Sequence, residues 1–63
     1  MNKVHTIRMD LGMSQESLAK EIGVSRQTIV AIERGNYTPS VLLALKMAKF
    51  FEQPVEAIFS IKK

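Results

Sequence analysis

The chain has 63 residues, a formal net charge of +3 and no cysteine. A chain of this length holds one domain, here residues 1–63, and the absence of cysteine excludes disulfides and thiolate metal sites. No apolar run approaches the roughly 18 residues of a membrane-spanning helix, and polar residues interrupt the N-terminus too often for a signal peptide. The mild basic excess is weak evidence for a nucleic-acid partner, so a partner has to be inferred from motifs.

The first predicted helix covers about residues 2–11 and ends at Gly12. Spacing of three and four residues puts four side chains on one face of it: Val4, Ile7, Arg8 and Leu11. A guanidinium on an apolar face needs a partner, because burying an unpaired charge is costly. We therefore hypothesise an ion pair between Arg8 and Glu33; the alternative is that both side chains face solvent.

Two short helices joined by a tight turn are predicted between Gln15 and Arg34. Small or apolar residues lie three and four positions apart in each helix: Leu18, Ala19 and Ile22 in the first, and Ile29 and Ile32 in the second. Val24, in the turn, is expected to plug the space between the two helices. Gly23 lies where the first helix must end and a positive φ is common. Ser14 and Ser25 precede the two helices as N-caps. This pattern is typical of a helix-turn-helix.

The second helix of this pair presents a face suited to DNA. At 100° per residue, Ile29, Ile32 and Glu33 point inward. The outward face and its N-terminal corner carry the following residues: Arg26, Gln27, Val30, Ala31 and Arg34. Arg can bind guanine or a phosphate, Gln can bind adenine, and Val or Ala can contact a thymine methyl group. The alternative is an ordinary solvated helix face.

A fourth helix is predicted from Val41 to about Phe51, with Ser40 as its N-cap after a polar loop. Its expected core side is the following set: Val41, Ala44, Leu45, Met47, Ala48 and Phe51. Leu42, Leu43 and Phe50 are more apolar than a solvated face requires. They indicate either a wider core contact or a surface covered by a second subunit.

The chain is predicted to end with one more helical turn. Pro54 suits the first position of a helix, and Val55, Ile58 and Phe59 would pack back on the core. Ile61 could extend as a short strand or join a subunit interface.

The residues needed for catalysis are missing from the sequence. His5 is the single histidine, so neither a catalytic triad nor a histidine-based metal set can be assembled with Ser14 or Ser25. We expect no enzyme activity, no metal, no cofactor and no small-molecule site.

The segment MSQESLAKEIGVSRQTIVAIERGNYTPS, followed by LLALKMAKFFEQPVEAIF, resembles the Cro/C1-type (XRE-like) helix-turn-helix of phage repressors and small bacterial regulators. The resemblance covers about residues 2–59. It implies an all-α, compact five-helix, lambda-repressor-like DNA-binding domain, with helices two and three as the helix-turn-helix. It also implies a homodimer on a palindromic operator, and family members often pair an Arg at the Arg8 position with a Glu at the Glu33 position.

The resemblance also implies roles for individual residues. Those facing the bases would be Arg26, Gln27, Val30 and Ala31. Those at the DNA backbone would be Gln15, Ser25, Thr28, Arg34, Asn36, Tyr37 and Thr38. The possible dimer surface follows instead from apolar side chains on the expected outward side of the fourth helix and in the tail: Leu42, Leu43, Phe50 and Ile61.

The sequence thus predicts a cytoplasmic, bacterial or phage-encoded regulator that binds double-stranded DNA and has no membrane partner. Repression by blocking polymerase is the expected output, because 63 residues leave no room for a separate effector domain. The alternative is an antitoxin-like or protein-interaction module with the same fold.

Overall fold

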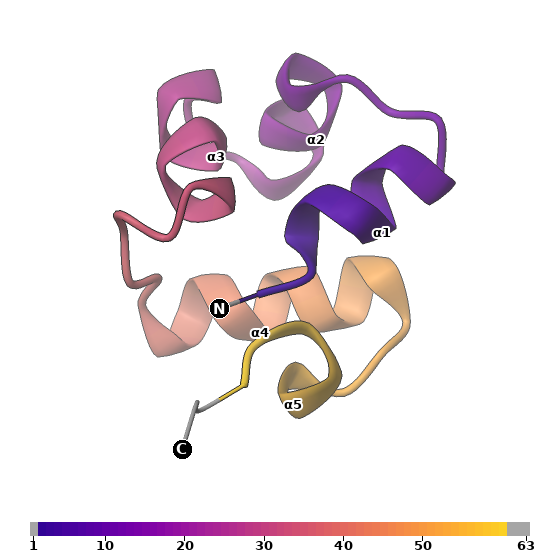
Figure 1. Cartoon of the computed structure of the whole chain (residues 1–63), viewed down its shortest axis with the longest axis vertical. Coiled ribbons are helices and arrows are strands. Elements are labelled where there is room, and N and C mark those ends of the chain that lie inside the picture. Colours follow the sequence, from indigo (N-terminus) through magenta and orange to yellow (C-terminus); the bar gives the residue numbers. More distant parts are fainter. Residues whose placement is uncertain (1, 61–63) are drawn as a thin grey trace.

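The computed structural model describes residues 2–60, which form five helices (Figure 1). In chain order these are α1 (Val4–Asp10), α2 (Gln15–Ile22), α3 (Arg26–Glu33), α4 (Val41–Phe51) and α5 (Val55–Ile58). The all-α class and the number of helices predicted from the sequence are confirmed. None of the helices in residues 2–60 is both long enough and apolar enough to cross a bilayer.

Local hydrogen bonds fix where three of the helices begin. Ser14, Ser25 and Ser40 each have extended backbone, and their side-chain oxygens accept from the backbone N–H three residues on, at 3.0, 3.2 and 3.1 Å. Such caps satisfy N–H groups that have no partner within the helix. All three were predicted N-caps.

The turn between α2 and α3 has the predicted left-handed glycine. Gly23 has a φ of +86°, and its N–H donates to the carbonyl of Ala19 at 2.8 Å. A residue with a Cβ is strained in this conformation, so glycine ends α2 here at little cost. The chain then reverses and α3 packs against α2.

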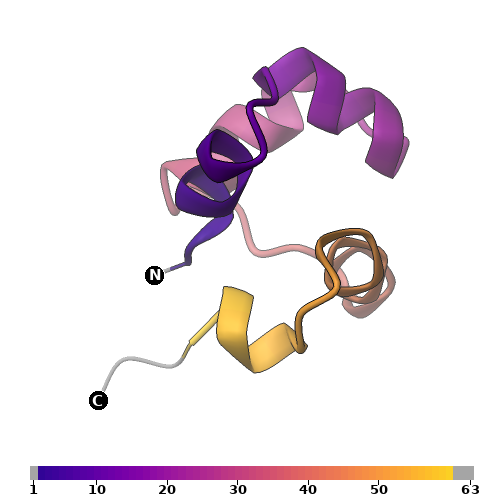
Figure 2. The ribbon, with the colours of Figure 1, turned by 90° about the vertical axis from the view of Figure 1, so that its right-hand side faces the viewer.

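The core lies where α1, α2 and α3 meet α4 and α5, with α4 running across one side of the other helices (Figures 1 and 2). Its fully buried large side chains come from all five helices: Val4, Leu18, Ile29, Ile32, Met47 and Ile58. Val24 and Phe59 are partly buried against this cluster. The core is what holds α2 and α3 in place, because helices of eight residues are not stable in isolation.

Two predicted helix faces are wrong in part. Val41 and Leu45, expected on the core side of α4, are 77 % and 54 % exposed, whereas Leu43, expected on its outward face, is buried. The first five residues of α4 are all apolar, so spacing alone does not define one stripe, and packing decides which side turns inward. Leu11 is exposed because α1 ends at Asp10.

The two ends of the described chain meet beside α5 (Figure 2). An isolated antiparallel bridge joins Asn2 to Phe59, and the N–H of Lys3 donates to the carbonyl of Ile58 at 2.8 Å. Pro54 precedes α5 as its N-cap rather than occupying its first position. The predicted strand at Ile61 lies outside the described residues.

Candidate nucleic-acid interface

Helix α3 is divided into an inward and an outward face. Ile29 and Ile32 are fully buried, and the side chain of Glu33 is only 6 % exposed. Arg26 and Gln27 are exposed at the start of the helix. The predicted base-reading surface is completed by Val30 and Ala31, which are partly exposed.

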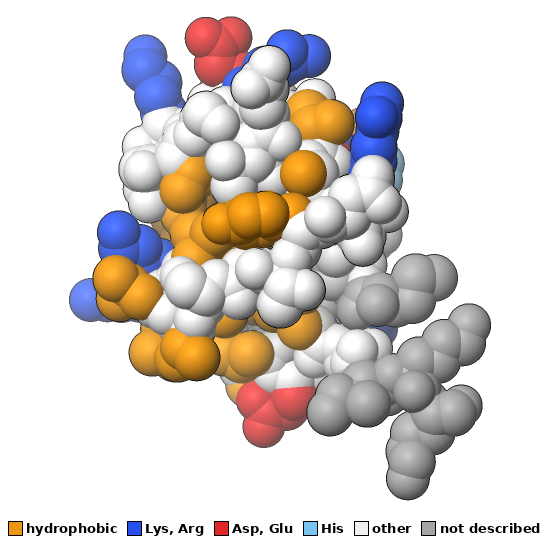
Figure 3. Space-filling model, turned by 90° about the vertical axis from the view of Figure 1, so that its left-hand side faces the viewer, with side chains coloured by type: hydrophobic (Ala, Val, Ile, Leu, Met, Phe, Trp, Pro, Cys, Tyr) orange, Lys and Arg blue, Asp and Glu red, His pale blue; other side chains and the backbone are white. Residues whose placement is uncertain are grey.

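The loop after α3 lies beside this outward face. Gly35 has a φ of +80°, and the N–H of Asn36 donates back to the carbonyl of Ala31 at 2.9 Å, which turns the chain away from the helix axis. Asn36, Tyr37 and Thr38 are exposed, as is Arg34 at the end of α3. Figure 3 views the side of the molecule that carries α3, this loop and the start of α4. Lys and Arg side chains stand at the upper and left edges of this view, with an acidic side chain among those at the top, and hydrophobic side chains gather in the middle and lower part.

The turn side of the motif carries two hydroxyl groups. The Ser25 and Thr28 side-chain oxygens are 3.0 Å apart, and Ser25 also caps α3. Two hydroxyls joined by one hydrogen bond have one hydroxyl hydrogen left to donate. This pair therefore retains one hydroxyl donor at the N-terminus of α3, the end of a helix where its dipole favours an anion.

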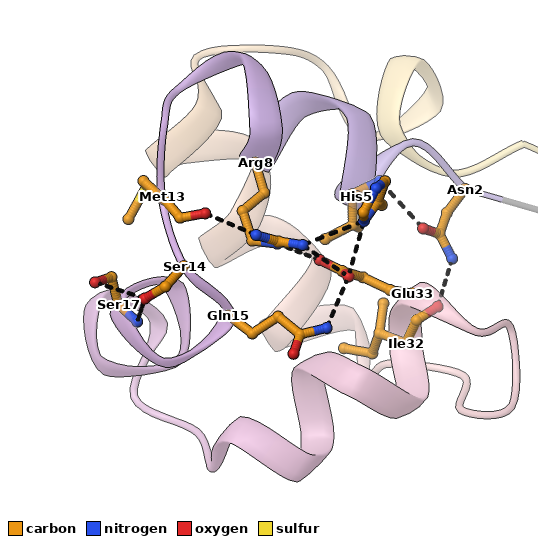
Figure 4. A network of polar contacts seen from close by, with 10 residues as sticks. Asn2, His5, Arg8, Met13, Ser14, Gln15, Ser17, Ile32 and Glu33 are labelled. Carbon is orange, nitrogen blue, oxygen red and sulfur yellow. Dashed lines mark hydrogen bonds and ion pairs between the residues drawn. The ribbon is translucent and has the colours of Figure 1, made fainter.

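The ion pair between Arg8 and Glu33 is present (Figure 4). Arg8 Nε donates to Glu33 Oε2 at 2.6 Å and Nη2 donates to Oε1 at 3.3 Å. The third nitrogen, Nη1, donates at 2.7 Å to the carbonyl of Met13, the residue before the N-cap of α2. One guanidinium therefore fastens α1 to the end of α3 and to the start of α2.

Gln15 and His5 complete the group of side chains around Glu33. Gln15 Nε2 donates to Glu33 Oε1 at 3.1 Å, and His5 Nδ1 lies 3.3 Å from the same oxygen. The sequence predicts a phosphate contact for Gln15 and no specific role for His5. Because His5 is one helical turn before Arg8 on α1, i, i+3 spacing was a signal that could have identified it.

Asn2 was also missed by sequence reasoning. Its Nδ2 donates to the Ile32 carbonyl at 2.8 Å, and its Oδ1 accepts from the Val4 N–H at 3.1 Å. Asn is common just before a helix, where its side chain accepts from backbone N–H groups, so the residue type could have indicated the contact with Val4. Asn2 therefore holds the start of α1 against the end of α3.

The surroundings of Glu33 shift its ionisation. Burial raises the pKa of its carboxyl, but hydrogen bonds from Arg8, Gln15 and His5 and the charge of Arg8 together lower that pKa below its ordinary value of 4.5. Hydrogen bonds that favour the charged form stabilise a carboxylate despite its burial. Glu33 is therefore ionised at neutral pH and does not act as a proton donor there.

This lowered pKa predicts how stability depends on pH. The unfolded chain takes up a proton on Glu33 at higher pH than the folded chain does, so the contribution of Glu33 is complete above about pH 4.5 and declines as the pH falls through the folded pKa. Urea unfolding from neutral pH down to about pH 3 measures this loss. A variant carrying both Arg8→Met and Glu33→Met is the control, and an equal acid loss in that variant would show that Glu33 is not responsible.

The predicted dimer surface is placed only in part. Leu42 and Phe50 are 64 % and 37 % exposed, but Leu43 belongs to the core, which corrects its assignment. Ile61 lies outside the described residues. Val41 and Leu45 are exposed beside Leu42 on α4 and extend the same apolar surface. In residues 2–60, no three His, Asp or Glu side chains form a group that could hold a metal ion.

Comparisons with known proteins agree with this geometry. A family model described as "Helix-turn-helix" matches residues 4–58. An uncharacterized HTH-type transcriptional regulator of Bacillus subtilis, YgzD, is 48% identical over 62 residues, covering 98% of this chain and 94% of the relative. One from Methanocaldococcus jannaschii is 55% identical over 58 residues, covering 92% and 88%.

A more distant relative is the transcriptional repressor RstR of the cryptic phage CTXphi in Vibrio cholerae. It is 32% identical over 59 residues, which cover 94% of this chain and 53% of RstR. The family match and the relatives span almost all of the helices described above. The chain therefore belongs to the Cro/C1-type helix-turn-helix family of DNA-binding transcriptional regulators.

Proposed function

We propose that this protein is a cytoplasmic repressor that binds a palindromic operator as a homodimer. The proposal rests on which side chains α3 buries and which it exposes. Its single acidic residue, Glu33, is buried in an ion pair, while Arg26 and Gln27 are exposed. An outward face with donors and no carboxylate suits the major groove, where base edges are read and phosphates repel acids.

The proposed binding mode places one α3 helix of each subunit in successive major grooves. The half-sites then lie about one DNA turn, roughly 34 Å, apart. Contacts from Gln15, the Ser25–Thr28 pair and the loop after α3 would go to phosphates, so they set affinity and register. Repression follows from occupying a promoter, and RstR, a relative named as a repressor, supports this output.

Selection of bound duplexes from a random DNA pool, read by sequencing, tests the proposal. An enriched inverted repeat with half-sites about one turn apart is the expected result. Increasing salt should weaken binding steeply, because phosphate contacts release counterions. Failure to enrich any sequence at low salt would reject sequence-specific DNA reading.

The homodimer is proposed to use the exposed apolar surface of α4, formed by Val41, Leu42 and Leu45. Burying one Leu side chain contributes about 1.5–3 kcal/mol, so Leu42→Lys should raise the dimer dissociation constant about tenfold or more. Analytical ultracentrifugation measures the change. Thr6→Lys, which adds the same charge at an exposed position of α1, is the control and should leave the dimer intact.

The same surface supports a second candidate function. An antitoxin-like or protein-interaction module would bind a different protein through the apolar side of α4. If Leu42→Lys abolished binding to such a protein and the wild-type chain selected no DNA sequence, this function would replace the first.

A further inference from the structure

The side-chain amide of Gln15 is held by a residue of the other helix of the motif. Gln15 is the first residue of α2 and is half-buried, and its Nε2 donates to Oε1 of Glu33, the last residue of α3, at 3.1 Å (Figure 4). The start of α2 and the end of α3 are therefore joined by a direct hydrogen bond.

Glu33 is itself fixed in orientation. Arg8 donates to both of its carboxylate oxygens, at 2.6 and 3.3 Å, and also donates to the Met13 carbonyl at 2.7 Å. The acceptor for Gln15 and the backbone that leads into α2 are thus held by the same guanidinium. A planar group with several donors is well suited to this task.

The chemistry of the carboxylate determines which way the Gln15 amide faces. An ionised carboxylate is an acceptor, so it binds the amide nitrogen and not the amide oxygen. The NH₂ group has two hydrogens, and one of them is used by Glu33. The second N–H remains for another acceptor. An amide without this partner turns freely and also presents its oxygen, which a phosphate repels.

We propose that Glu33 is a positioning residue for DNA binding: it holds the Gln15 amide so that the second N–H is presented to a backbone phosphate. The inference rests on the proposed DNA-binding function and assigns to α3 a task besides base reading. Glu33 is the last residue of α3, the base-reading helix. Its hydrogen bond to Gln15 therefore fixes the position of the phosphate-binding amide of α2 relative to the base-reading side chains of α3.

A thermodynamic cycle on DNA affinity tests the role. Gln15→Ala is made in the wild-type chain and in a chain carrying Arg8→Met and Glu33→Met, where apolar side chains of similar length replace the ion pair. In the wild-type chain it should weaken binding roughly tenfold for the selected operator and for unrelated duplex alike, because a hydrogen bond to a charged phosphate is lost. In the second chain it should weaken binding less than about twofold.

An Asn2→Ala chain is the matched control. Asn2 bonds the Ile32 carbonyl, so its loss loosens the same junction between α1 and α3 without removing the acceptor of Gln15. In this chain Gln15→Ala should again lower DNA affinity roughly tenfold. If Gln15→Ala also lowered DNA affinity tenfold in the Arg8→Met, Glu33→Met chain, the positioning role of Glu33 would be overturned.

The wild-type protein provides a second measurement that does not depend on folding of the variants. In ¹H–¹⁵N spectra of the free protein, the side-chain amide hydrogens of Gln15 should exchange with water more slowly than those of exposed Gln27. Equal exchange rates would overturn the proposal. If the operator is bound but Gln15→Ala has no effect, the positioning role fails while the proposed function stands; if no operator is selected, the proposed function itself fails.

Discussion

Arg8→Ala is expected to lower the free energy of unfolding by about 3–5 kcal/mol, because it leaves a buried carboxylate without its guanidinium partner. The Arg8 and Glu33 side chains are 8% and 6% exposed, so solvent does little to screen the loss. The change also removes the donor to the Met13 carbonyl. Since a domain of this size has a total stability of roughly 3–9 kcal/mol, the change should remove a large fraction of that stability and lower the urea midpoint accordingly. Urea denaturation followed by circular dichroism measures the effect.

The double change Arg8→Met with Glu33→Met separates loss of a partner from loss of the ion pair. Replacing both charges with apolar side chains of similar length is often neutral or stabilising, so this variant should unfold within about 1 kcal/mol of wild type. An Arg8→Ala variant that lost less than about 1 kcal/mol would show that the pair behaves as a surface ion pair.

Arg26→Ala is expected to relax base preference at one position of each operator half-site. An Arg side chain bound to a guanine discriminates against other bases by about 1–3 kcal/mol, and Arg26 is exposed at the N-terminal end of α3, the end that enters the groove in helix-turn-helix proteins. Affinity for the selected operator should fall about tenfold or more, while affinity for unrelated duplex should change little. Repeating the DNA selection with the variant shows which position has lost its preference.

Arg34→Ala is the matched control for Arg26→Ala. It removes the same charge from the other end of the exposed face, and by proposal its contact is a phosphate. It should weaken binding to all duplexes alike and reduce the dependence of affinity on salt. If Arg26→Ala also weakened all duplexes equally, Arg26 would be a phosphate contact rather than a base-reading residue.

The sequence by itself determined where α2, α3 and α4 begin and where α2 ends, because these boundaries depend on local interactions. Ser14, Ser25 and Ser40 cap helices through N–H groups three residues away, and Gly23 takes a left-handed conformation that a Cβ disfavours. The inward side of α3 was also predictable, since Ile29 and Ile32 are its two isoleucines at helical spacing. The ion pair between Arg8 and Glu33 was predictable as well, because a guanidinium on an apolar helix face is costly to bury without an acidic partner.

The tertiary structure decided two kinds of feature: which face of a helix turns toward the core, and which side chains far apart in the sequence contact each other. In α4, apolar residues occupy every side of the first turn, so only packing against the other helices determined that Leu43 is buried while Val41 and Leu45 are exposed. The contacts of Gln15 and His5 with Glu33 were not predicted, because Glu33 is 18 and 28 residues away from them and helical spacing relates only residues within a few turns of one helix. Local propensity fixes helix ends, whereas the side that an all-apolar helical turn buries is set by the core that it completes.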